Sequence, residues 1–194
     1  MVDQFSLPGM SATQPPTDRL FFGVFPEAEL TPRITRTAEQ IRTRHALAGK
    51  PLPPERFHVT LFHLGDYVGL PEALVRTATE AAATLAARPF AVGFDRAGSF
   101  TGKSGKLPLV LRGGAGVEQL KVFQQNLGTA LQRAGLGRHV GTQFVPHVTL
   151  LYDVTAVAEE AVEPIAWTVR EFVLVHSLLG QTRHIPLGRW PLRG

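Results

Sequence analysis

The sequence predicts an α+β fold with antiparallel sheets, and three observations lead to this class. Short apolar segments rich in aromatic and β-branched residues alternate with segments whose apolar residues recur at helical spacing. Several predicted strands follow one another with no helix between them, which favours antiparallel pairing over a doubly wound parallel sheet. One four-residue motif occurs in two of the strands, about half a chain apart, which indicates two related halves.

The first predicted elements are a strand and a helix. Residues 20–25 are apolar and aromatic, and Pro26 ends them, which is typical of a buried strand. A helix is expected over residues 27–47. Its apolar residues recur at intervals of three and four: Leu30, Ile34, Ala38 and Ile41.

A second strand and helix follow a rigid loop. Residues 49–54 contain three prolines and cannot be helical. The next segment, FHVTLFHL at residues 57–64, is a predicted strand that stops at Gly65. Residues 71–87 are rich in alanine and carry apolar side chains along one side, so a helix is expected there.

The rest of the chain is predicted to hold two strands, the clearest helix, and then strands again. Residues 90–94 and 107–111 are the two strands, joined through the glycine-rich basic segment 98–106, which we expect to be a mobile loop. The helix spans residues 117–134, where Gly135 can cap it. Three strands complete the chain: residues 145–152, 167–177 and 185–190.

Composition limits the possible functions. The chain has 194 residues, of which 44% are hydrophobic and 19% charged, enough apolar material for one domain with a real core. It has no cysteine, which excludes disulfide scaffolds, thiolate metal sites and cysteine nucleophiles. No apolar run reaches the roughly 20 residues of a membrane-spanning helix. The net charge of +4 suits an anionic ligand or RNA.

The organisation expected from the sequence is a flexible tail over residues 1–18 followed by a single domain over residues 19–194. The first 17 residues are rich in Ser, Thr, Gln and Pro and lack the pattern of an export signal. With no such signal and no cysteine, the cytoplasm is the expected location. A monomer is the simple expectation at this size.

The motif that carries chemistry is HVTL, at residues 58–61 and again at residues 147–150. The two histidines are 89 positions apart (147 − 58). In a strand, residues i and i+2 share a face with their Cα atoms roughly 6.5–7 Å apart. Each motif strand therefore presents an imidazole and a hydroxyl side by side, and its valine and leucine point into the core.

Two such strands around one pocket suit phosphodiester chemistry. An imidazole titrates near neutral pH, so one histidine can accept a proton while the other donates one. Threonine hydroxyls can donate to nonbridging phosphate oxygens. A lone histidine in an apolar strand is usually structural, but a structural histidine has no reason to recur with the same threonine partner. The duplication therefore favours a paired catalytic role.

The residues also resemble a known family. Besides the two HVTL motifs, the segments RLFFGVF at residues 19–25 and EFVLVHSLL at residues 171–179 resemble the first and closing strands of the two-histidine (2H) phosphoesterase superfamily. Within it, the chain is most similar to bacterial 2'-5' RNA ligases, also called RNA 2',3'-cyclic phosphodiesterases. The resemblance implies a bilobal fold in which two pseudo-symmetric lobes with antiparallel sheets surround a central cleft, with helices on the outside.

The resemblance also implies an activity and its residues. It implies hydrolysis of a 2',3'-cyclic phosphate to a 2'-phosphate without metal or cofactor, with 2'-5' ligation as the reverse reaction in some members. His58 would donate a proton to the leaving 3' oxygen, His147 would activate water, and Thr60 and Thr149 would hold the phosphate. The partner would be RNA or a nucleotide with a cyclic phosphate end, and not a membrane.

One position departs from the family pattern. Many members carry a basic residue five positions after the second histidine, and this chain has Tyr152 there and His63 after the first motif. By strand parity both should face away from the catalytic side unless the strand bulges. The same parity places His58 and His63 on opposite faces, which argues against a shared metal ion.

Other interpretations stay open. One is a non-catalytic module that binds RNA or phosphate, and another is a phosphodiesterase for 2'-5' oligonucleotides or small cyclic nucleotides. Three arginines near predicted strand ends could line the cleft, although a position at the surface is the more common role for each: Arg56, Arg112 and Arg138. Phe57 and Phe144 are expected in the core rather than stacked on a base.

Overall fold

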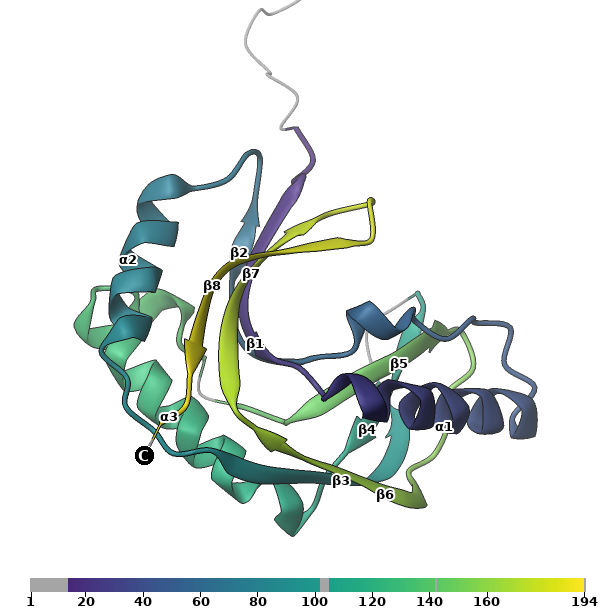
Figure 1. The fold of residues 1–194 in the computed structure, drawn as a ribbon. Helices are drawn as coiled ribbons and strands as arrows, with labels where there is room; N and C mark the ends of the chain where they lie inside the picture. Colours follow the sequence, from purple (N-terminus) through teal and green to yellow (C-terminus); the bar gives the residue numbers. More distant parts are fainter. Residues whose placement is uncertain (1–13, 102–104, 142, 194) are drawn as a thin grey trace, which may run out of the picture.

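The computed structural model describes residues 14–101, 105–141 and 143–193. In these residues it has an α+β architecture of two four-stranded antiparallel sheets and three α-helices (Figure 1). The helices are α1 (Thr31–Arg44), α2 (Glu72–Ala83) and α3 (Glu118–Arg133). The strands are β1 (Asp18–Val24), β2 (Val59–Tyr67), β3 (Phe90–Ser99), β4 (Leu107–Arg112), β5 (His147–Asp153), β6 (Glu160–Val169), β7 (Glu171–Leu178) and β8 (Arg183–Pro191).

The two sheets have the same internal plan. The first has the strand order β2-β1-β7-β8 and the second β5-β4-β3-β6, with every neighbouring pair antiparallel. In each sheet a motif strand, β2 or β5, lies at one edge next to the strand that precedes it in the sequence. The pseudo-symmetric lobes are therefore confirmed. They are not two halves of the chain, however, because the first sheet combines strands from both ends and the second uses the middle.

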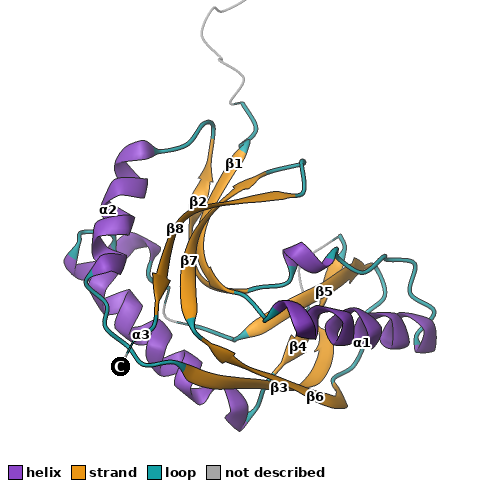
Figure 2. Cartoon of the chain, viewed as in Figure 1, coloured by secondary structure: helices purple, strands orange, loops and turns teal. Residues whose placement is uncertain are grey.

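Helices α1 and α3 each connect two strands of one sheet and also contact the other sheet. Helix α1 connects two strands of the first sheet but packs against β5 and β6 of the second (Figures 1 and 2). Helix α3 connects two strands of the second sheet and contacts β2 of the first as well as β3. Helix α2 packs against α3 and β8. Each sheet therefore has helices on its outer face, and each motif strand is preceded by a helix that reaches the other sheet.

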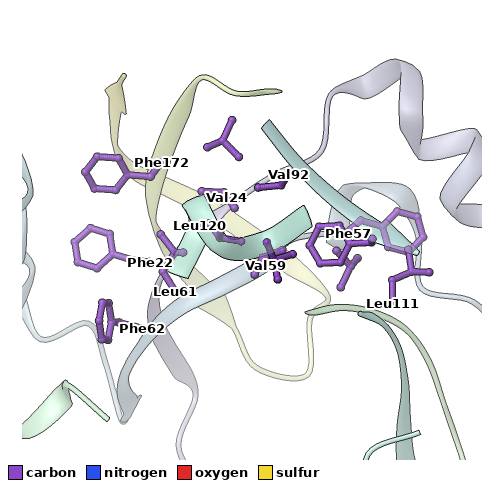
Figure 3. Packing of buried hydrophobic residues seen from close by; sticks show 14 of the residues in the cluster. Phe22, Val24, Phe57, Val59, Leu61, Phe62, Val92, Leu111, Leu120 and Phe172 are labelled. Carbon is purple, nitrogen blue, oxygen red and sulfur yellow. The ribbon is translucent and has the colours of Figure 1, made fainter. Parts of the chain in front are cut away.

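A continuous cluster of buried apolar side chains includes residues of both sheets and all three helices (Figure 3). The apolar residues of both motifs belong to this cluster and are at most 3% exposed: Val59, Leu61, Val148 and Leu150. The stripe of α3 is buried as its spacing predicts. No helix in the described parts of the chain is long and apolar enough to cross a membrane.

The structure corrects three predicted boundaries. The strand expected over residues 167–177 is two strands, since β6 ends at Val169 and β7 begins at Glu171. Strand β6 starts earlier than expected, at Glu160, and tolerates Pro164 because it lies at a sheet edge. The helix expected from residue 27 begins at Thr31, after a single 3-10 turn.

Two predictions about flexible segments fall largely outside the described residues. Residues 1–13 of the expected tail and residues 102–104 of the expected basic loop are among those not described. At the end of the expected tail, the Thr17 N–H donates to the Tyr67 carbonyl at 2.8 Å, and Asp18 is the first residue of β1.

Candidate active site

A cavity of about 300 Å³ lies between the two motif strands. His58 and Thr60 line it from the first sheet, and His147 and Thr149 line it from the second. The four polar residues that the repeat singles out therefore surround one space, with the valines and leucines of the motifs buried behind them. A larger hollow of about 650 Å³ lies between α2 and α3, and no histidine lines it.

Both histidines are oriented by the same backbone contact. The Nδ1 atom of His58 lies 2.6 Å from the carbonyl oxygen of Arg56, and the Nδ1 atom of His147 lies 2.7 Å from that of Val145. A carbonyl oxygen only accepts, so each Nδ1 carries the hydrogen and donates it. The ring nitrogen left for proton transfer is therefore Nε2 in both cases.

The first histidine lies in an aromatic environment. The ring of His58 stacks on Phe21 with 4.8 Å between centroids, and the edge of His184 meets it at 5.2 Å. Burial lowers the pKa of His58 to about 4, with smaller contributions from the neighbouring His184, Arg56 and His147. This buried environment therefore keeps the imidazole neutral at physiological pH.

The second histidine has a related but more open environment. Phe100 meets the ring of His147 edge-on at 4.9 Å, and the Arg112 guanidinium lies 5.5 Å from the Phe100 centroid. Burial, and secondarily the charge of Arg112, lower the pKa of His147 below its ordinary value. Arg112 is itself paired with Glu159 at 2.8 Å.

His63 and Tyr152 line the same cavity, so the expectation that they face away is wrong. The reason is a bulge in each motif strand. In the first sheet Gly23 pairs with Thr60 and Phe22 with Phe62, which leaves one extra residue, Leu61. An extra residue reverses the alternation of side chains beyond it.

The second motif strand bulges at the equivalent place. Val110 pairs with Thr149 and Leu109 with Leu151, so Leu150 is the extra residue. The fourth residue of each HVTL motif is thus inserted into the ladder, and the residue five positions after each histidine turns toward the cavity. The parity argument that separated His58 from His63 fails for the same reason. The described residues nevertheless contain no group of three His, Asp or Glu side chains placed to hold a metal ion.

Comparison with known families supports the geometry. The sequence model of the 2'-5' RNA ligase superfamily matches residues 26–181, which is most of the chain and includes both motifs. The chain belongs to this superfamily. No curated protein sequence matches it significantly.

Several solved structures share the fold of this superfamily member. TT0787 of Thermus thermophilus is 24% identical, with a TM-score of 0.74 over 91% of this chain and 98% of its own. A protein described as a phosphoesterase is 26% identical, with a TM-score of 0.70 over 93% of this chain and 100% of its own. E. coli LigT is 27% identical, with a TM-score of 0.65 over the same shares.

Within this superfamily fold, three lining residues are ones that sequence reasoning did not select: Arg19, Arg56 and His184. Arg19 and His184 lie outside the matched range of residues 26–181. The sequence favoured the surface for Arg56 and left a position in the cleft open, and the structure places it in the cavity lining, at the end of the 3-10 turn Pro54–Arg56. No local pattern marks Arg19 and His184, since sheet packing brings them to the site, whereas Arg56 lies two positions before His58 in the sequence.

Arg19 and His63 share one carboxylate at the side of the cavity where Tyr152 lies. Arg19 donates to Asp66 through two nitrogens at 2.7 Å each, and His63 Nε2 lies 2.8 Å from Asp66. Arg19 and then His63 hold the pKa of Asp66 far below its ordinary value. The charge of Arg19 is therefore already balanced before any ligand arrives.

The two aromatic residues considered for base stacking do not line the cavity. Phe57 is 1% exposed and belongs to the core, and Phe144 packs against the core. The core assignment made from the sequence is confirmed for Phe57, whereas Phe144 is only partly buried. The aromatic side chains that do line the cavity are Phe21 and Tyr152.

Proposed function

We propose that the protein is an RNA 2',3'-cyclic phosphodiesterase that hydrolyses cyclic phosphate ends to 2'-phosphates. The observation that carries the proposal is the pair of imidazoles from two sheets, each anchored through Nδ1, that line one cavity with two threonine hydroxyls. An acid and a base on opposite sides of a phosphorus atom are what in-line displacement requires.

The proposed step needs one water molecule and no other reactant. His147 Nε2 accepts a proton from water as its oxygen attacks phosphorus. The bond from phosphorus to the 3' oxygen breaks, and protonated His58 gives its Nε2 proton to that oxygen. The products are a 2'-phosphate and a 3'-hydroxyl, and proton exchange with solvent restores both histidines. The same displacement, with a 5'-hydroxyl in place of water as the nucleophile, joins two RNA ends through a 2'-5' linkage.

Thr60 and Thr149 are assigned to the nonbridging oxygens of the phosphate. Each follows its histidine by two positions and lines the same cavity. Their hydroxyls can donate to the oxygens on which charge increases in the transition state. The acid and base are both protein side chains, so the proposed reaction needs no metal ion or cofactor.

Nucleotides as the substrate class are supported by one relative. Crystal structures of E. coli LigT include complexes with 3'-AMP, ATP and phosphate. LigT covers 93% of this chain at 27% identity. We therefore propose RNA or a nucleotide with a 2',3'-cyclic phosphate as the partner of the cavity.

The direct test is incubation with a nucleoside 2',3'-cyclic phosphate in excess EDTA, with 2'- and 3'-phosphate products resolved by chromatography. We expect a 2'-phosphate, abolished in His58→Ala and in His147→Ala. His45→Ala is the matched control, because His45 lies at the end of α1 and does not line the cavity. No turnover on the nucleotide, and none on a short RNA with a cyclic phosphate end, would favour a phosphate-binding module.

A further inference from the structure

Two residues that line the cavity each have a buried side-chain nitrogen without a hydrogen-bond partner. Within residues 14–101, 105–141 and 143–193, three buried side-chain nitrogens have no hydrogen-bond partner. Two of the three, Arg56 Nε and His184 Nδ1, belong to residues that line the cavity of the paired histidines. A buried polar nitrogen without a partner is costly, so each of these groups needs an explanation, and a bound ligand is one.

Arg56 differs from the other arginines around the site. Arg19 is paired with Asp66 and Arg112 with Glu159. Arg56 forms no ion pair with any residue that the structure describes, and its backbone carbonyl is the group that anchors His58. One residue therefore fixes the orientation of this imidazole through its main chain and presents an uncompensated guanidinium to the same cavity.

His184 faces Arg56 and His58 from strand β8. Its ring meets the edge of Phe21 at 5.4 Å and of His58 at 5.2 Å. Burial, and then the charge of Arg56, lower the pKa of His184 to about 4. This imidazole is therefore neutral at physiological pH, and one of its nitrogens is an N–H donor.

The charge balance of the cavity indicates what these groups bind. The pKa values of both motif histidines are lowered, which disfavours positive charge on either imidazole. A phosphodiester carries one negative charge, and a second develops as water attacks. Arg19, the other arginine that lines the cavity, is paired with Asp66, which leaves the guanidinium of Arg56 as the cation to meet that charge.

We propose that Arg56 and His184 bind a phosphate oxygen of the substrate next to His58, with Arg56 supplying the positive charge. The inference rests on the proposed function for its ligand class. The cation comes from the 3-10 turn that leads into β2, in the first sheet. The guanidinium fork of an arginine suits the oxygens of a phosphate.

The first test measures inorganic phosphate binding by calorimetry, which needs no turnover. Arg56→Gln is expected to weaken phosphate binding by about tenfold or more, since charge-assisted hydrogen bonds contribute more than neutral ones. Arg56→Lys keeps the charge and should recover part of the loss. Arg76→Gln, on the exposed side of α2, removes the same charge away from the cavity and should change nothing.

The phosphate oxygen can belong to the reacting group or to a flanking phosphate, and two substrates separate these sources. If Arg56→Gln lowers kcat/KM about tenfold to a hundredfold on a nucleoside 2',3'-cyclic phosphate, Arg56 binds the reacting phosphate. If kcat/KM falls only when the nucleotide also carries a 5'-phosphate, Arg56 binds that flanking phosphate. Unchanged phosphate binding and unchanged kcat/KM on both substrates would overturn the inference.

A second readout separates this role from a purely structural one. The Arg56 charge lowers the pKa of both His58 and His184, so Arg56→Gln should raise both values in an NMR titration of the ring protons. His184→Phe keeps the aromatic edge contact, removes the ring nitrogens and should weaken phosphate binding severalfold. If the wild type binds phosphate through Arg56 but turns over no cyclic phosphate, the proposed function fails and this inference stands.

Discussion

The pH dependence of kcat/KM is the strictest test of the two-histidine mechanism. The active form needs His58 protonated and His147 neutral. The pKa of His58 is about 4, and the pKa of His147 is lowered below its ordinary value of about 6.5. The pair then titrates in two macroscopic steps. Between the two pKa values, the fraction of enzyme with His58 protonated and His147 neutral is small and constant. Above the higher one it falls tenfold per pH unit.

The magnitude follows from the upper limit on the pKa of His147. That pKa lies below 6.5, so pH 8 is more than 1.5 units above it. We therefore expect kcat/KM at pH 8 to be at least about thirtyfold below its plateau on the acid side of pH 6.5. The bound phosphate anion favours the imidazolium form, so the kcat profile should lie at higher pH than the kcat/KM profile.

The assay uses initial rates at substrate concentrations well below KM, from pH 4.5 to 9 at constant ionic strength. The phosphodiester does not titrate in this range, so changes in rate report the enzyme. Circular dichroism at each pH checks that the fold is retained. A kcat/KM that stays level or rises between pH 6.5 and pH 8 would refute the assignment of both histidines to proton transfer in this low-pKa environment.

Three further changes test the site and the fold around it. Thr60→Val and Thr149→Val keep the side-chain shape and should each lower kcat/KM about tenfold without changing stability, as measured by steady-state kinetics and thermal melts. Asp18→Asn weakens the buried contact to His176 at 2.5 Å and should lower the free energy of unfolding by about 2 kcal/mol in urea titrations. Gly49→Ala would press a Cβ against the Tyr152 carbonyl oxygen, well inside van der Waals contact, so it should destabilise the protein by about 1–3 kcal/mol in the same assay.

The Asp18 contact also has a predictable pH dependence. Hydrogen bonds from Thr17 and His176 lower the pKa of Asp18 in the folded protein. Its contribution to stability is therefore complete above the unfolded carboxyl pKa of about 3.9 and is lost as the pH falls through the folded value. The stability difference between wild type and Asp18→Asn should accordingly shrink only in strongly acidic solution.

The spacing of apolar residues along the chain predicted those helices and strands whose burial pattern lies within one continuous segment. The stripe of α3 placed that helix at residues 117–134, and the structure has Glu118–Arg133. Sheet membership has no such signal, because the pairing of β1 with β7 joins segments about 150 residues apart in the sequence. Strand β6 was missed over its first part, since an edge strand with Pro164 on its exposed side lacks the apolar alternation of a central strand.

The site was predictable to the extent that it repeats. The four motif residues were found because the same pattern occurs twice and strand parity places His and Thr together. His63 and Tyr152 were misplaced because a bulge depends on the partner strand as well as on the strand that contains it. His184 left no pattern at all, since the last strand brings it to His58 only in the folded protein, whereas Arg56 lies two positions before His58 in the sequence.

The bulge in β5 has a second consequence, which links the two sheets at the site. Leu150 is the inserted residue, and its carbonyl oxygen accepts a hydrogen bond from the Leu52 N–H at 2.7 Å. Leu52 lies in the rigid loop that leads to His58. The N–H of Gly49, earlier in that loop, donates to the Asp153 carboxylate at 2.6 Å. The segment that positions the first histidine is thus held on the outer edge of the strand that carries the second. The same inserted residue that turns Tyr152 toward the cavity therefore also fixes the two halves of the acid–base pair relative to each other.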